Sequence, residues 1–230
     1  MIISREHNFI FLKTEKTASS TLEKYLRSTI RDRELLVPAT PKNKKLIIRS
    51  HGTLAESSFC GGLGGASRIL PNFLGLHGHA RAEDIRKFLG ADLFDSYKII
   101  TSERNPWDRQ ISLFWHRSSK RGRAVTPESF NAAMHSTLYN LRHYNRLRNW
   151  EIYSIDGRPC AHKVIRFENL KEDLKEIATA LGLEFGDGIP HERGQYGRLG
   201  ADYKYFYQDS TRDLIYDWYR NEIDHFGYKF

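Results

Sequence analysis

A lysine and several hydroxyl side chains follow the first apolar stretch of the chain. From Lys13 to Thr21 the sequence reads Lys-Thr-Glu-Lys-Thr-Ala-Ser-Ser-Thr, with two lysines and five hydroxyl groups. An ammonium group, hydroxyls, backbone N–H groups and the positive end of a following helix together suit a phosphate or sulfate. Two interpretations stay open, an anion-binding loop or a turn that is merely rich in hydroxyls. The stretch has no Gly-Lys-Ser/Thr ending and so is not a Walker A loop.

Two histidines form a second candidate group, in the stretch Leu-His-Gly-His-Ala. His77 and His79 are two residues apart, which places both side chains on one side of an extended segment. They could be structural, bind a metal, or supply a general base that takes a proton from an alcohol. No third ligand has a matching short spacing, which disfavours the metal. The pattern alone favours the structural interpretation.

A third group combines an arginine with a serine eight residues later. We expect Arg104 at the end of a strand and Ser112 in the second turn of the next helix. A guanidinium group can bind two oxygens of an anion while a hydroxyl binds a third. The alternative is that Arg104 pairs with Glu103 or Asp108 and that Ser112 faces water.

The elements that position these groups follow from the apolar pattern. Phe9–Leu12 is a continuous apolar run, typical of a strand buried on both faces. Apolar residues then recur with helical spacing from Leu22 to Ile30, which predicts a helix capped by one of the hydroxyl residues, Ser19, Ser20 or Thr21. A strand over 97–102 leads into a helix that Asn105 caps.

The rest of the chain continues this alternation. A strand is expected at 46–48 and a helix over 82–89. A hairpin is expected from 152–155 through the turn Asp156-Gly157 to 161–167, and a helix over 170–181. Strands that alternate with helices predict an α/β fold with a parallel sheet covered on both faces. Ligands are then expected at the C-terminal ends of the strands. We expect one domain over residues 1–230.

Three motifs resemble sulfotransferases that use 3′-phosphoadenosine 5′-phosphosulfate (PAPS), particularly those that act on carbohydrates. Lys16-Thr17-Ala18-Ser19-Ser20-Thr21 is similar to the family's loop for the 5′-phosphosulfate, with Glu15 where the family usually has proline. The stretch from His79 to Ile85 is similar to the family's His-Ala-x-Ala-x-x-Ile. Arg104-Asn105-Pro106-x-x-Arg109-x-x-Ser112 is similar to its 3′-phosphate motif.

The resemblance implies a three-layer P-loop-like fold, with a central, mainly parallel sheet flanked by helices. It implies transfer of the sulfuryl group from PAPS to a hydroxyl group, most simply of a carbohydrate, with His79 as general base. Lys16 would stabilise the leaving phosphate, and the residues from Thr17 to Thr21 would complete the phosphosulfate site. Arg104 and Ser112 would bind the 3′-phosphate. His77 would contact the acceptor, and no metal would be needed.

The amino-acid composition is compatible with each of these interpretations. The chain has 230 residues, a formal charge of +8, 40% hydrophobic and 13% aromatic residues, which indicates a globular protein with an anionic partner. We expect a cytoplasmic protein with free thiols at Cys60 and Cys160, with one disulfide as the alternative, because no signal peptide or membrane-length apolar run is evident. A mobile loop is expected at Gly61–Gly65. The basic run from Lys120 to Arg123 is either a solvated loop or part of an anion-binding surface.

Other function classes stay open. A P-loop kinase would need a glycine-rich Lys-Ser/Thr loop and magnesium-binding carboxylates, which the sequence does not display. A basic nucleic-acid-binding module would suit the charge, but no known binding motif accompanies it, and we expect no nucleic-acid partner. A relative that binds the nucleotide without catalysis is a further alternative.

Overall fold

The chain forms two compact units in the computed structural model, which describes residues 1–30, 35–37, 46–50, 53–57, 78–141, 146–185 and 202–230. Unit 1 comprises Met1–Glu103 and Asn149–Pro190, and unit 2 comprises Arg104–Arg148 and His191–Phe230. Whether the two units form the single domain expected from the sequence stays a prediction. His77, the Gly61–Gly65 loop and Cys60 lie outside the described residues.

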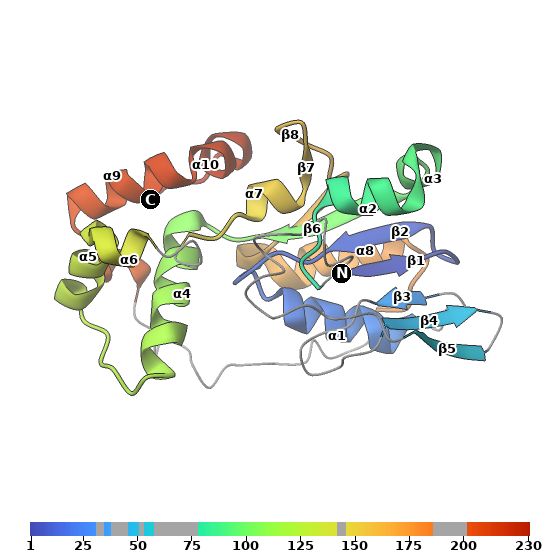
Figure 1. Cartoon of the computed structure of the whole chain (residues 1–230), viewed down its shortest axis with the longest axis horizontal. Coiled ribbons are helices and arrows are strands. Elements are labelled where there is room, and N and C mark those ends of the chain that lie inside the picture. The colour runs from blue at the N-terminus through green and yellow to red at the C-terminus, as the bar shows by residue number, and fades with distance from the viewer. Residues whose placement is uncertain (31–34, 38–45, 51–52, 58–77, 142–145, 186–201) are drawn as a thin grey trace. The chain divides into compact units, whose positions relative to one another are not determined.

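Unit 1 is built on a seven-stranded mixed sheet with the order β5-β4-β3-β1-β2-β6-β9 (Figure 1). The strands are β1 (Ile2–Ser4), β2 (Phe9–Leu12), β3 (Leu35–Val37), β4 (Leu46–Ser50), β5 (Thr53–Ser57), β6 (Lys98–Glu103) and β9 (Lys163–Arg166). β2 pairs with β6, and β6 with β9, in parallel. The pairs β1–β2, β1–β3, β3–β4 and β4–β5 are antiparallel.

The predicted α/β class is confirmed, and the predicted parallel arrangement holds for β2, β6 and β9. The expectation of a mainly parallel sheet is wrong for the half that contains β1, β3, β4 and β5. The physical reason is connection length. Four residues join β1 to β2 and two join β4 to β5, too few for the crossover that a parallel pair requires. Two short strands, β1 and β3, and the paired strand β5 gave no separate signal in the sequence.

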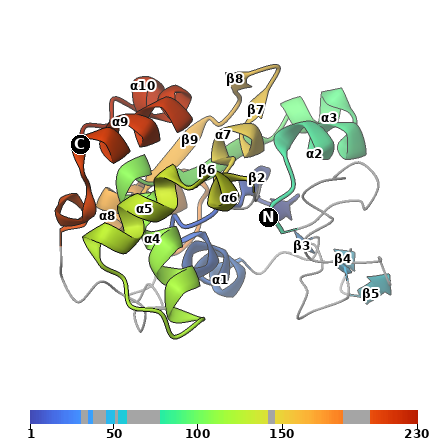
Figure 2. The same ribbon diagram turned by 60° about the vertical axis from the view of Figure 1, so that its left-hand side comes forward.

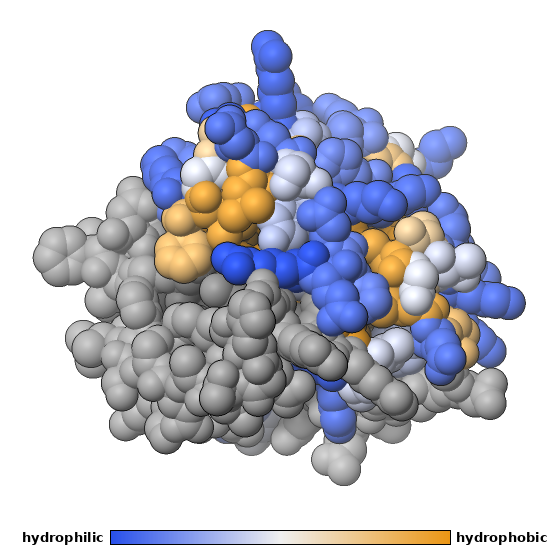
Figure 3. All heavy atoms as spheres, turned by 90° about the vertical axis from the view of Figure 1, so that its right-hand side faces the viewer, coloured by the Kyte–Doolittle hydropathy of each residue, from blue (hydrophilic) through white to orange (hydrophobic). Residues whose placement is uncertain are grey.

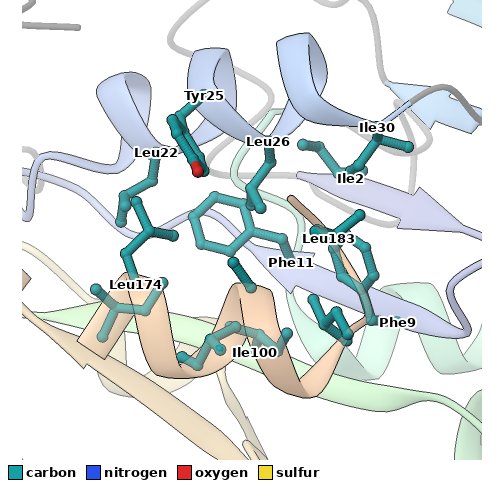
Figure 4. Packing of buried hydrophobic residues seen from close by; sticks show 14 residues of the cluster. Ile2, Phe9, Phe11, Leu22, Tyr25, Leu26, Ile30, Ile100, Leu174 and Leu183 are labelled. Carbon is teal, nitrogen blue, oxygen red and sulfur yellow. The ribbon is translucent and has the colours of Figure 1, made fainter. Parts of the chain in front are cut away.

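Helices cover both faces of this sheet. α1 (Ser19–Thr29) and α8 (Leu170–Ala180) share one core with alternate residues of β2, namely Phe9 and Phe11. Leu22, Tyr25 and Leu26 of α1 point toward Phe11, as the sequence spacing predicts (Figure 4). α2 (Ala82–Leu89) and α7 (Asn149–Ile152) lie on the opposite side of the sheet from α1 (Figures 1 and 2).

Smaller elements complete unit 1. α3 (Ala91–Asp95) follows α2, and the 3-10 turn η3 (Phe167–Asn169) joins β9 to α8. β7 (Ser154–Ile155) and β8 (Arg158–Pro159) form a hairpin about the predicted turn. Its two turn residues have positive φ angles, 51° at Asp156 and 73° at Gly157, as a two-residue hairpin loop requires. The predicted second arm, 161–167, is wrong, because Lys163–Arg166 pairs with β6 as β9 of the main sheet.

Unit 2 is helical, with α4 (Pro106–Ser119), α5 (Pro127–His135), α6 (Thr137–Asn140), η5 (Tyr203–Phe206), α9 (Asp209–Trp218) and α10 (Arg220–Phe226). Aromatic residues dominate its core, including Trp107, Phe114 and Phe130. The Asn105 side chain accepts a hydrogen bond from the Trp107 N–H, which confirms the predicted cap of α4. The fully buried Arg109 pairs with Glu222, at 3.0 Å, and therefore serves the core.

The described residues visible in Figure 3 are mainly hydrophilic. On the face drawn in Figure 3, apolar side chains occupy separate patches among hydrophilic ones, and the exposed apolar residues of the chain include Phe88 and Leu93 (Figure 3). Lys120–Arg123 is exposed at the C-terminal end of α4. Cys160 carries a free thiol. None of the helices that the structure describes has the length and apolarity needed to cross a bilayer.

Candidate anion-binding site

The loop between β2 and α1 adopts an unusual backbone conformation. Lys16 has a φ angle of 63° and Ala18 one of 60°, whereas Thr17 between them does not have a positive φ. The left-handed conformation costs a residue other than glycine about 1–2 kcal/mol. Left-handed residues that alternate with ordinary ones turn successive N–H groups toward one concavity, where an anion can bind. The loop thus places two left-handed residues on either side of Thr17 although it contains no glycine.

The start of α1 corrects one expectation from the sequence. Ala18, not Ser19, Ser20 or Thr21, is the N-cap residue, and no side chain caps the helix there. Ser19 instead donates its hydroxyl hydrogen bond back to the main-chain oxygen of Thr14. Ser20 is half-buried and Thr21 buried, both in the first turn of α1. Since no side chain caps this turn, its positive end suits an anion.

Three buried hydroxyl groups attach the loop to β6. Thr17 Oγ1 lies 2.8 Å from both Thr14 Oγ1 and Ser102 Oγ, and Thr14 Oγ1 lies 3.0 Å from Ser102 Oγ. Thr14 Oγ1 also donates to the main-chain oxygen of Ser102. All three side chains are fully buried. The Thr17 hydroxyl therefore holds the loop, and only its main chain is left for the predicted role in anion binding.

A buried asparagine holds the next residue of the loop. The N–H of Glu15 donates to Asn149 Oδ1 at 2.9 Å, and Asn149 Nδ2 donates to the Glu15 carbonyl at 3.0 Å. Asn149 is fully buried at the start of α7. A proline at position 15 would lack the N–H that makes the first of these bonds. Glu15 therefore supplies a main-chain donor that proline could not supply.

The two lysines of the loop have different environments. Lys13 is buried and its Nζ pairs with Glu23 Oε2 of α1. The N-terminal amino group of Met1 lies 3.9 Å from the other Glu23 oxygen. Burial raises the pKa of Glu23, but the amino group and Lys13 outweigh it and lower that pKa below its ordinary value. Lys13 therefore neutralises Glu23, and the half-buried Lys16 is the lysine suited to bind an anion.

His79 lies against the same loop. Its Nδ1 atom is 2.8 Å from the main-chain oxygen of Lys13, a residue 66 positions earlier. A carbonyl oxygen can only accept, so Nδ1 carries the hydrogen and the neutral ring has its lone pair on Nε2. The ring is half-buried. This geometry gives His79 the tautomer that a general base needs.

Two further carboxylates of unit 1 have side-chain partners. Arg81, two residues after His79, pairs with Glu151 of α7. Glu103, at the C-terminal end of β6, is fully buried and accepts a hydrogen bond of 2.9 Å from the Tyr153 hydroxyl. The sequence named Glu103 only as a possible partner of Arg104.

In unit 2, Arg104 contacts both Asp108 and Ser112. The sequence left open whether its guanidinium pairs with a carboxylate or joins Ser112 at an anion. Its Nε and Nη2 atoms bond to Asp108 Oδ2, each at 2.6 Å, and its Nη1 atom lies 3.4 Å from Ser112 Oγ. Arg104 and Asp108 are buried, and Ser112 is half-buried. Asp108 thus orients the guanidinium so that Nη1 faces the Ser112 hydroxyl.

The sequence identified some of the residues described above in each of the two units. It identified Lys16 and His79, which the structure brings to one loop of unit 1, and the pair of Arg104 and Ser112 in unit 2. It missed Ser102 and Asn149, whose contacts with the loop join residues 85 to 134 positions apart. Among the residues described here, no cluster of three or more His, Cys, Asp and Glu side chains is arranged to hold a metal ion.

Comparison with known proteins gives little further information. No family model matches the chain, and no solved structure matches it. An uncharacterized protein of Archaeoglobus fulgidus is 28% identical over 102 residues, which cover 43% of this chain and 79% of that protein.

Proposed function

We propose that this protein is a sulfotransferase that transfers the sulfuryl group of PAPS to a hydroxyl group of an acceptor, most simply a carbohydrate. The observation that carries the proposal is the contact between His79 Nδ1 and the carbonyl oxygen of Lys13. It joins the candidate base to the loop that is the candidate sulfate site.

The phosphosulfate is the ligand that suits the loop in the proposed reaction. Lys16 supplies a cation, and the left-handed residues Lys16 and Ala18 supply the backbone of an anion cradle. The uncapped first turn of α1 adds a positive helix end. These groups suit the charge that grows on the bridging oxygen of the leaving 5′-phosphate. The proposal includes no metal, because lysine and helix end supply positive charge where it is needed.

The base takes part through its Nε2 atom. As the acceptor oxygen bonds to sulfur, the bond from sulfur to the bridging phosphate oxygen breaks, and the acceptor proton passes to His79 Nε2. The products are a sulfate ester and 3′,5′-adenosine diphosphate. The Lys13 carbonyl holds the ring and stabilises the imidazolium that results.

The 3′-phosphate is assigned to Arg104 and Ser112. This phosphate distinguishes the donor from ATP, and a guanidinium beside a hydroxyl is a suitable pair for it.

A three-layer P-loop-like fold is part of the same proposal. It is supported by the parallel strands β2 and β6, whose C-terminal ends precede Lys13 and Arg104 respectively.

Transfer of labelled sulfate from PAPS to a panel of sugars tests the proposal. Lys16→Ala and His79→Ala should each lower turnover by about 10²-fold or more, because one removes charge stabilisation and the other the base. Lys171→Ala, which removes an exposed lysine of α8 in the same unit, is the matched control and should be unchanged. Near-normal turnover in either test variant would remove that residue from the mechanism.

A further inference from the structure

One short helix contacts both the anion loop and the segment that carries the candidate base. α7 spans Asn149–Ile152. Asn149 binds the N–H and the carbonyl of Glu15, which directly precedes Lys16. Two residues later, Glu151 pairs with Arg81, which is two residues beyond His79. No motif in the sequence points to this helix.

The position of Lys16 depends on its two neighbours. Lys16 is left-handed, an unfavourable conformation that persists only where the surroundings impose it. On its C-terminal side, the hydroxyl of Thr17 is fixed to Ser102. On its N-terminal side, Asn149 fixes both hydrogen-bonding groups of the Glu15 main chain. Asn149 and Thr17 thus restrain the main chain on either side of Lys16.

We propose that Asn149 and Glu151 make α7 a positioning element for the sulfate loop and the base. Asn149 holds Lys16 in its anion-binding conformation, and Glu151 holds the segment of His79 through Arg81. This inference rests on the proposed function for its catalytic consequence. Neither residue is assigned a contact with the donor or the acceptor.

The first experiment compares Asn149→Ala with a matched control in the full-length chain. Asn131 is also buried and bridges main-chain groups, donating to Pro127 and Phe206 and accepting from Gln208, all in unit 2. Asn131→Ala should therefore cost comparable stability without acting on the loop. Hydrogen exchange, followed by mass spectrometry, should accelerate in the peptide that contains Lys13–Ala18 only in Asn149→Ala.

Binding of 3′,5′-adenosine diphosphate and PAPS turnover give the functional readout. Asn149→Ala should weaken binding about 10-fold or more, whereas Asn131→Ala should bind as the wild type does. Glu151→Gln removes a half-exposed ion pair, so it should fold normally. It should lower kcat about 3- to 10-fold with an unchanged KM for PAPS, because it acts on the base and not on the loop.

The outcomes separate this inference from the function on which it rests. A wild-type protein that neither binds the nucleotide nor transfers sulfate would overturn both. Wild-type activity that Asn149→Ala and Glu151→Gln retain in full would overturn the inference alone. The same holds if exchange in the loop peptide does not change in Asn149→Ala, or if Asn131→Ala weakens binding equally.

Discussion

The hydroxyl groups of Thr17 and Ser102 lie 2.8 Å apart, fully buried, although 85 residues separate them in the chain. The contact ties the loop after β2 to the end of β6. It also assigns the Thr17 hydroxyl a structural task, where resemblance had implied a ligand. Buried hydroxyls that lose a partner leave an unsatisfied group, which costs about 1–3 kcal/mol.

Thr17→Val should therefore destabilise the protein by about 1–2 kcal/mol, because valine keeps the shape and removes the hydrogen bonds to Thr14 and Ser102. Thr17→Ser keeps the hydroxyl and should be considerably closer to the wild type. Urea unfolding followed by circular dichroism measures both. Equal stability of the valine and serine variants would show that the buried hydroxyl is dispensable.

Glu23→Gln should destabilise the protein at neutral pH, by about 3 kcal/mol, because it leaves the buried Lys13 without its carboxylate. The pKa of Glu23 is lowered in the folded protein from an ordinary 4.5. The stability that its ionised form contributes is therefore complete above about pH 4.5 and is lost as the pH falls through the lowered value. Thermal unfolding between pH 3 and pH 7 should show the wild-type advantage shrink at the acid end.

An exposed ion pair supplies the control for this prediction. Glu83 pairs with Lys87 one turn later on α2, and both side chains are largely exposed. Glu83→Gln should change stability by no more than about 0.5 kcal/mol. A comparable loss in the two variants would mean that burial of the Lys13–Glu23 pair has no energetic consequence.

The sequence predicted the elements whose signals are local. The apolar run of β2, the helical spacing of α1 and the Asn105 cap each depend on residues within one or two turns. It predicted β4 but not the other strands of the antiparallel half, because strands such as β1, with three residues, carry too short a pattern to distinguish from a loop.

The residues of the candidate site likewise fall into those that local motifs identify and those that only folding brings together. Lys16, His79, Arg104 and Ser112 stand in recognisable motifs, so resemblance could identify them. Asn149 stands in no motif, and its importance arises only when folding brings it to Glu15, 134 positions away. Side chains that hold a loop through its main chain leave no fixed pattern in sequence, since any residue can supply the main-chain groups.

Ala18→Gly should preserve or raise stability, by up to about 1 kcal/mol. Ala18 has a φ angle of 60°, which glycine adopts without the steric cost that alanine has. The greater freedom of glycine in the unfolded chain offsets part of this gain. Thermal unfolding provides the measurement, and Ala132→Gly at an exposed interior position of α5 is the opposite control, expected to lose about 0.5–1 kcal/mol. A clear loss in Ala18→Gly would contradict the left-handed loop.

Arg104→Ala should remove the preference for a nucleotide that carries a 3′-phosphate. The proposal assigns that phosphate to Arg104 and Ser112, which lie 3.4 Å apart. Calorimetry with 3′,5′-adenosine diphosphate and with AMP separates this contribution, because the two ligands differ only in the 3′-phosphate. We expect wild-type protein to prefer the first ligand by at least 10-fold, and Arg104→Ala to bind both with similar, weak affinity. Ser112→Ala should lose a smaller part of the preference, because it removes one neutral donor.

Arg104→Lys separates charge from geometry in the same assay. A lysine keeps the positive charge but cannot bond to Asp108 and face Ser112 at once through a planar fork. It should therefore recover only part of the preference that Arg104→Ala loses. Full preference in Arg104→Lys would mean that charge alone binds the phosphate. An unchanged preference in Arg104→Ala would instead assign Arg104 to its ion pair with Asp108, as a structural residue of α4 and not a ligand of the nucleotide.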